Sequence, residues 1–409
     1  MLNSIPDHRK RHTYEVAEIL SAGILMFVLR CESRNQADQL AGQQFEQNYL
    51  KVFGMRLPIT DTVHDFLEQL DPKELEFLRE SLVRKLMVRK VFEQWKFQGY
   101  YNLTFDATGT HVFDEEPFEG CPYKETKNDM KWYVSVLEAK LVFTNGFSIS
   151  LARNGLKIRA VRLTNRIVIG ATTRRAAFKR LVKKVKTAFP RLAIVVTADG
   201  LYCCEPVFKL IKECGWKFIF TFTDDSLKSL WRTINKSTLN RQKQTIKKLP
   251  NGKWIVDEFS WINDLPYKDQ QVNFITYQQY EDQQIVERHV HLANLTINEK
   301  NAKQISEQGR LRWNIENQGF NAQKNHGFAL EHKYARKGFN TMKNYYLLMQ
   351  IAHMISQLVE KTKSFQQALN YSGRTIRYVI KDLIAMLTRQ ICSPKNIHRH
   401  YRKIKQLRY

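Results

Sequence analysis

Two aspartates stand at the ends of predicted β-strands. Asp106 closes the run LTFD, and Asp199 closes the apolar, β-branched run AIVVTAD. Ligands collect at the carboxyl edge of open α/β sheets, so neighbouring strands would bring these two carboxylates face to face. Such a pair is costly unless cations neutralise it, which is the ordinary reason for two divalent ions about 3.5–4 Å apart. Hard oxygen ligands suit Mg²⁺, with Mn²⁺ as its substitute.

A third carboxylate, Glu316, lies in the helix-like run RWNIENQGF. On a helix across the strand ends it would complete a cage for two ions, which activate water or a 3′-hydroxyl. Each residue also has a simpler explanation. An Asp beside Gly at a strand end is commonly a turn residue. Glu316, four residues after Arg312, could form a helical ion pair contributing roughly a few tenths of a kcal/mol. Composition and spacing leave both interpretations open.

The composition indicates a polyanionic partner. The 409 residues include 65 Lys and Arg against 40 Asp and Glu, a net charge of +25. Basic surface gains affinity by releasing counterions from phosphate. Charge alone does not separate DNA from RNA or from an acidic membrane. A hydrophobic content of 43% is enough to bury a sizeable core and argues against wholesale disorder.

Cysteine spacing and the apolar runs favour a cytoplasmic protein without a membrane partner. The six cysteines form no CxxC pair and no zinc-finger spacing, so we expect reduced thiols. The longest apolar run, residues 19–29, is too short to span a bilayer. Glu15 and Glu18 precede it and no small-residue cleavage site follows, so a buried helix is predicted rather than a signal peptide.

The periodicity of the chain changes near residue 98. Residues 1–97 carry apolar residues at helical spacing, and Asp71 followed by Pro72 predicts the start of a helix. Strand and helix patterns then alternate, which predicts an α/β fold with a mixed sheet flanked by helices. The predicted strands are 99–109, 131–143, 146–153, 191–200 and 216–224, with helices at 176–189 and 205–214.

Residues 225–295 interrupt this order with three alternating runs typical of an antiparallel sheet. We expect its aromatic residues to form a small core of their own; they are Trp254, Phe259, Trp261, Phe274 and Tyr277. His289 and His291 alternate along one predicted strand face, but no third ligand is near in sequence, so no metal role is expected for them. Helical patterns resume at 296, and the chain ends in a basic stretch.

From Ile5 to about Leu358 the chain resembles a DDE transposase of bacterial insertion sequences, of the branch with a β insertion in its RNase H-like core. FDATG and TADGLYCCEPVF resemble the two aspartate motifs, and RLRWNIENQGFNAQKNHGFALEH resembles the glutamate signature. The motifs come in family order, 93 and then 117 positions apart (106 to 199 to 316). The second gap has room for the insertion.

This resemblance implies a domain organisation and a metal site. The expected regions are 1–97, helical and DNA-binding; 98–224 and 296–365, the two parts of the RNase H-like core; 225–295, the β-rich insertion; and 366–409, a basic C-terminal tail. Asp106, Asp199 and Glu316 would be the catalytic residues and the ligands of two Mg²⁺ ions.

The glutamate motif also implies DNA contacts, with two departures. Arg312 stands where the family has an arginine. Gly309 stands where the family has a tyrosine, and Gln323 where it has a lysine, with Lys324 one position later. Arg312 could grip phosphate bidentately. Further candidates, each with a purely structural alternative in the core or in helix capping, are Trp313, Asn317, Asn321 and His326.

The implied function is DNA transposition. The enzyme would bind the terminal inverted repeats of its element, cleave the DNA with metal-dependent chemistry and transfer the strand to target DNA. A homodimer is expected because two element ends must be joined, and its place would be the nucleoid. Two alternatives stay open: a structure-selective nuclease on the same core, and a catalytically dead DNA-binding relic.

One basic segment has two explanations. Residues 139–198 contain 14 Lys and Arg and no Asp or Glu. A DNA-facing surface would account for this. Alternatively, the resemblance implies an acidic loop here, and residues 155–168 can be encoded so that another frame reads an acidic, turn-forming segment. We therefore hypothesise that residues 153–176 are read out of frame, which could leave the protein inactive. The nucleotide sequence of the gene decides between these explanations.

Overall fold

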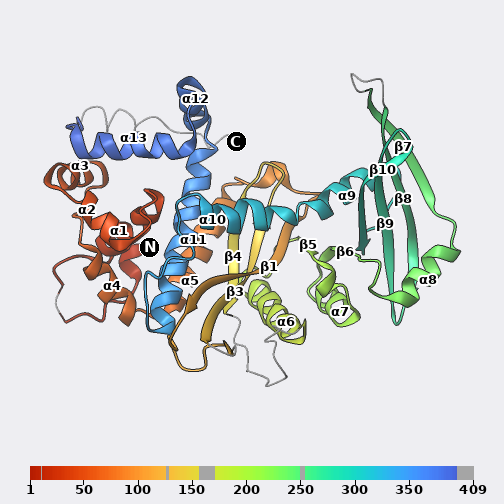
Figure 1. Ribbon diagram of the computed structural model, residues 1–409, viewed down its shortest axis with the longest axis horizontal. Helices are drawn as coiled ribbons and strands as arrows, with labels where there is room; N and C mark the ends of the chain where they lie inside the picture. The colour runs from red at the N-terminus through yellow and green to blue at the C-terminus, as the bar shows by residue number, and fades with distance from the viewer. Residues whose placement is uncertain (11, 126–128, 156–170, 249–253, 394–409) are drawn as a thin grey trace.

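The computed structural model describes residues 1–10, 12–125, 129–155, 171–248 and 254–393 (Figure 1). Over these residues it is a mixed α/β protein built on one ten-stranded mixed sheet, as the sequence predicts for the fold class. The strands are β1 (Tyr101–Phe113), β2 (Tyr123–Glu125), β3 (Met130–Val142), β4 (Ser148–Gly155), β5 (Ile194–Ala198), β6 (Lys217–Thr221), β7 (Asn240–Lys248), β8 (Trp254–Tyr267), β9 (Gln270–Glu281) and β10 (Gln284–Ala293).

The strand order is β2-β3-β1-β5-β6-β10-β9-β8-β7, with β4 pairing β3 as well. The first strands are antiparallel: β3 pairs β1, β2 and β4. In contrast, β5 is parallel to both β1 and β6. All five residues of β5 are buried, which is the pattern of a strand covered on both faces.

The strands of the predicted insertion join this sheet. β10 pairs antiparallel with β6, with His291 opposite Thr221, and β9, β8 and β7 continue outward (Figure 1). The expectation of a separate aromatic core is therefore wrong. Phe274 lies in the main core, and Trp261 packs in a cluster that includes residues of β5 and β6. Trp254 is 49% exposed.

Residues before the sheet are helical, as predicted. The elements are η1 (Leu2–Ser4), α1 (Val16–Val28), α2 (Arg34–Leu40), α3 (Gln43–Phe53), α4 (Thr60–Gln69), α5 (Pro72–Val88) and η2 (Glu93–Trp95). The predicted start of α5 is confirmed: the Asp71 carboxylate accepts a hydrogen bond from the Lys73 N–H at 3.0 Å, and Pro72 is the first helical residue. The apolar run at 19–29 forms most of α1, which is largely buried. No described helix has the length and apolarity to cross a membrane.

The remaining helices cover the sheet and link it to the N-terminal region. They are α6 (Ala171–Ala188), η3 (Gly200–Tyr202), α7 (Glu205–Glu213), α8 (Lys228–Lys236), α9 (Ala302–Arg310), the π-helix η4 (Ile315–Asn321), α10 (Ala322–Asn325), α11 (Phe339–Glu360), α12 (Lys363–Ser372) and α13 (Ile376–Arg389). α6 and α7 contribute to the main core, whereas α11 packs against α1, α4 and α5 in a second core.

Two predictions from the sequence concern segments that lie partly outside the described residues. Of the segment proposed to be out of frame, residues 156–170 lie outside the described ranges, and so do residues 394–409 at the chain end. The rest of the predicted basic tail differs from expectation, because it folds as α12 and α13. α13 packs against α3, where the Asn48 amide donates to the carbonyl of Leu387 at 2.8 Å.

Candidate active site

Asp106 and Asp199 each follow, by two residues, the last paired position of the neighbouring parallel strands β1 and β5. Thr104 of β1 and Thr197 of β5 are register partners, and their hydroxyl oxygens lie 2.6 Å apart. Asp106 lies two residues after Thr104 within β1 and so on the same face of the sheet. Asp199 lies two residues after Thr197 but just beyond the end of β5, where its carboxylate caps η3 by accepting a hydrogen bond from the Leu201 N–H at 2.9 Å. Adjacent strands are about 4.8 Å apart. The prediction that Asp106 closes its strand is wrong, because β1 continues to Phe113 paired with β3. Asp199 does follow the last residue of β5, as predicted.

The electrostatics of Asp106 link all three predicted carboxylates. Burial raises the pKa of Asp106 above its ordinary value, and the negative charges of Asp199 and Glu316 raise this pKa further. The Ala107 N–H, 2.8 Å from Oδ1, and the Arg312 guanidinium act in the opposite direction. Asp199 and Glu316 therefore both lie close enough to Asp106 for their negative charges to disfavour its charged form.

Glu316 is carried by a π-helix, whereas the sequence predicts an ordinary helix. Ile315 and Phe320 are fully buried and pack with Val142 of β3. η4 also contacts β1 and β4, so it lies over the same part of the sheet as Asp106. Glu316 itself is exposed. π-helical turns are rare and occur frequently at functional sites, because the extra residue in the turn changes the direction of the side chains.

The donor set suits a hard divalent cation, since carboxylate oxygens are the ligands that Mg²⁺ and Mn²⁺ take. Burial chiefly raises the pKa of Asp106, and the charges of Asp199 and Glu316 add to this effect; a bound cation would favour the charged carboxylate instead. Over the described residues, however, no three His, Cys, Asp or Glu side chains are gathered closely enough to hold one ion. Asp106 lies within β1, Asp199 follows β5, and Glu316 lies on the π-helix, where its charge raises the pKa of Asp106.

Arg312 lies directly beside the candidate site. One of its guanidinium nitrogens is 3.9 Å from the Asp106 carboxylate, and the guanidinium carbon is 4.4 Å from the centre of the Trp313 ring. The helical ion pair with Glu316 that the four-residue spacing allowed is not formed in the described structure. Trp313 is 53% exposed, so the alternative that it is a core residue is wrong.

The other predicted DNA contacts follow along the same segment. Asn317, Asn321 and His326 are exposed. Asn321 accepts a hydrogen bond from the side-chain amide of Asn325. Lys324 forms an ion pair with Glu331 at 2.9 Å. These side chains remain accessible from solvent, and nothing in the fold commits them to the interior.

The two positions that differ from the glutamate motif, Gly309 and Gln323, are both buried in the protein. Gln323 is fully buried, and its amide donates to Gln350 Oε1 at 2.9 Å, so it offers nothing to a ligand at the surface. At Gly309 a Cβ would lie 2.5 Å from the ring of His291. The His291 ring is 3% exposed and fills this space; burial lowers its pKa to about 3, and its Nδ1 has no hydrogen-bond partner.

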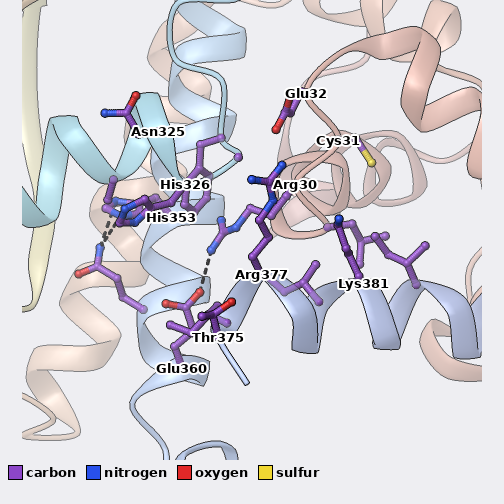
Figure 2. A pocket seen from close by; sticks show the side chains of 18 of the residues that line it. Arg30, Cys31, Glu32, Asn325, His326, His353, Glu360, Thr375, Arg377 and Lys381 are labelled. Carbon is purple, nitrogen blue, oxygen red and sulfur yellow. Dashed lines mark hydrogen bonds and ion pairs between the residues drawn. The ribbon is translucent and has the colours of Figure 1, made fainter. Parts of the chain in front are cut away.

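A cavity of 740 Å³ beside the Glu316 segment was missed by the sequence analysis. It opens between the turn after α1, the end of α10, α11 and α13 (Figure 2). Arg30 pairs with Glu360 at 2.7 Å inside it, and its guanidinium lies 3.4 Å from the centre of the Phe328 ring. Arg377 and Lys381 of α13 are exposed and contribute cations to its lining. Their four-residue spacing is a helical signal within the stretch predicted as a tail.

Buried polar side chains on β3 and β4 were also missed. Glu138 accepts hydrogen bonds from Ser150 at 2.7 Å and from the Tyr346 hydroxyl at 2.8 Å. Lys140, two residues further along β3, is completely buried. Both are opposite residues of the β1 segment that ends in Asp106. The sequence signal was present, because charged residues interrupt the apolar run YVSVLEAKLVF.

Comparison with known proteins adds no relative. A scan against protein-family models found no matching family, and a search of curated proteins found no match.

Proposed function

We propose that this protein is a DNA transposase that binds the terminal inverted repeats of an insertion sequence and catalyses metal-dependent cleavage and strand transfer. The observation that carries the proposal is the relation among the three carboxylates. Asp106 and Asp199 each follow the last paired residue of β1 and β5 by two positions, and Glu316, more than a hundred residues further along the chain, still raises the pKa of Asp106.

The architecture supports the same proposal. β3 pairs antiparallel with β1 and with β4, and parallel strands β5 and β6 follow with helices packed on them. In the chain, β7 to β10 come between β6 and the helices that carry Glu316. This arrangement suits an RNase H-like core with a β insertion. Asp199 follows the carboxyl end of β5, the kind of position where α/β sheets bind ligands, and Asp106 lies just beyond the part of β1 that pairs with β5, which supports the proposal.

The proposed chemistry assigns a role to each of the four central residues. Asp106, Asp199 and Glu316 would hold two Mg²⁺ ions, with Mn²⁺ as a substitute. These ions supply Lewis acidity and an activated oxygen nucleophile. Arg312, beside Asp106, would bind the scissile phosphate and keep it against the carboxylates. Water attacks the first phosphodiester and frees a 3′-hydroxyl, which then attacks a second phosphodiester in the target.

The DNA-binding surface would run along the exposed side of the Glu316 segment. Trp313 could stack on an unpaired base, and Asn317, Asn321, Lys324 and His326 could contact phosphates. The net charge of +25 favours this partner. Joining two ends requires two copies, so we propose a homodimer in the DNA complex, located at the nucleoid.

A strand-joining assay tests the function against both alternatives. Inverted repeats found in DNA flanking the gene would supply labelled substrates, incubated with the full chain, Mg²⁺ and a target plasmid. Joined products support the transposase. Cleavage without joining would indicate the structure-selective nuclease. Binding that needs no Mg²⁺ and leads to no cleavage would indicate the DNA-binding relic.

A further inference from the structure

Lys140 is a completely buried cation, and the charge of Glu138 only partly offsets the effect of burial on it. Its side chain is completely buried in β3 between Thr104 of β1 and Ser150 of β4. An ammonium has three donors, yet among the described residues Lys140 makes one hydrogen bond, from Nζ to Gln350 Oε1 at 3.2 Å. Burial lowers its pKa to about 8. A buried, under-bonded charge costs stability, so its place in the core calls for a role beyond packing.

The head of this lysine lies under the π-helix. Nζ is 5.0 Å from the centre of the Phe320 ring, a cation–π distance. A Cβ at Gly319 would lie 3.3 Å from Nζ and 3.0 Å from the Ser148 hydroxyl. These distances are tighter than ordinary van der Waals contact, so a larger residue at Gly319 would require Lys140 or Ser148 to shift by a few tenths of an ångström.

The hydrogen bond from Lys140 to Gln350 also helps to hold the end of η4 in place. Gln350 of α11 and Gln323 of α10 exchange two side-chain hydrogen bonds, at 2.9 Å and 3.1 Å. Gln323 follows the last residue of η4 by two positions. The π-helix is thus held at Ile315 and Phe320 by Val142, under Gly319 by Lys140, and just beyond its end by Gln350.

We propose that Lys140 is a positioning residue: its buried ammonium holds the π turn against β3 and so keeps the Glu316 carboxylate turned toward Asp106 and Asp199. Glu316 lies one π turn before Asn321. If η4 relaxed to α-helical geometry, the direction of Glu316 would change relative to Phe320. The metal role rests on the proposed function, whereas the support of the π turn stands on the contacts themselves.

Metal binding by the full chain tests this role without reference to activity. Free Mn²⁺ is followed by electron paramagnetic resonance as MnCl₂ is titrated into the parent, Lys140→Met, Lys343→Met and Asp106→Asn. Methionine keeps most of the length of the lysine and removes its charge. Lys343, on α11, is the matched control: it is partly buried, burial lowers its pKa too, and it packs on Phe339 instead of η4.

Lys140→Met is expected to raise the half-saturating Mn²⁺ concentration at least tenfold, with Lys343→Met within twofold of the parent. Phe320→Leu keeps an apolar contact with Val142 but removes the aromatic ring beside Lys140 Nζ, so it should weaken Mn²⁺ binding a few-fold. This variant provides the test if Lys140→Met does not fold. Parental Mn²⁺ affinity in a folded Lys140→Met or Phe320→Leu chain, beside clear loss in Asp106→Asn, overturns the positioning role alone. Binding that Asp106→Asn leaves unchanged rejects the metal site itself, and the role of Lys140 with it.

Discussion

The hydroxyls of Thr104 and Thr197 share a hydrogen bond of 2.6 Å across β1 and β5. This pair is completely buried and fixes the register of the two strands two residues before Asp106 and Asp199. The contact therefore fixes the backbone from which both aspartates extend. Asp106 continues β1, whereas Asp199 begins the turn after β5, and its carboxylate accepts a hydrogen bond from the Leu201 N–H at 2.9 Å.

The metal-free site should be less stable at higher pH. The pKa of Asp106 is raised in the folded protein, chiefly by burial, so the folded state holds this proton more tightly than the unfolded state. The free energy of unfolding then falls as pH rises from the ordinary Asp pKa, about 3.9, through the raised one. Asp106→Asn should raise the thermal midpoint in EDTA at pH 8, with a smaller gain at pH 5. Asp269→Asn, an exposed control, should leave the thermal midpoint unchanged at both pH 5 and pH 8. An unchanged or lower midpoint for Asp106→Asn at pH 8 would contradict the raised pKa of Asp106.

Trp313 should contribute to DNA affinity and little to stability. Because its ring is 53% exposed, Trp313→Ala should change the free energy of unfolding by no more than about 0.5 kcal/mol. Loss of base stacking should weaken binding of DNA with unpaired terminal bases by about 1–3 kcal/mol, with less effect on blunt duplex. Trp254→Ala, which removes another exposed tryptophan on β8, is the control. Equal losses for both DNA forms would argue against stacking.

Arg377 and Lys381, which line the cavity, should each contribute a phosphate contact to DNA binding. DNA affinity of the parent should fall linearly with salt on logarithmic axes. Arg377→Ala with Lys381→Ala should reduce that slope by about 2, one for each lost phosphate contact. Lys209→Ala with Lys268→Ala is the control, since both lysines pair with Glu205 on α7. A slope equal to that of the parent would place the DNA elsewhere, and a flat salt response in the parent would refute the electrostatic account.

Gly309 and His291 should behave as a coupled pair. Gly309→Ala places a methyl group 2.5 Å from the His291 ring and should destabilise the protein. His291→Ala leaves a cavity and removes a buried nitrogen that lacks a partner. The double variant should be less destabilised than the sum of the two single variants, by about 0.5–3 kcal/mol in denaturant unfolding. Strict additivity would mean that the two positions do not share this space.

Local patterns in the sequence account for much of the fold. Asp71 and Pro72 mark the start of α5, and the β-branched run before Asp199 marks a buried strand, because both signals are complete within a few residues. Pairing of β10 with β6 was not predictable in this way, since the partners are distant in sequence and their register depends on tertiary packing. The expected aromatic core of the insertion was wrong for this reason.

The candidate site was predictable in composition but less so in geometry. Asp106 and Asp199 could be chosen from strand ends, and Glu316 from its motif. The π-helix could not be anticipated, because over seven residues α and π turns place apolar side chains in similar patterns. Lys140 was not anticipated either, since a lysine within an apolar run is usually solvent-exposed. α13 was missed because the basic stretch that follows it, residues 398–409, suggested a solvated end for the whole region.

The most direct test of the central claim is cleavage of terminal-repeat DNA by single-carboxylate variants. The parent should cleave with Mg²⁺ and be silent in EDTA. Asp106→Ala, Asp199→Ala and Glu316→Ala should each abolish cleavage while binding the same DNA with nearly parental affinity, and double variants should be no worse than single ones, because ligands of one site act as a unit. Cleavage within a few-fold of the parent in any one variant, or cleavage that persists in EDTA, would contradict the account.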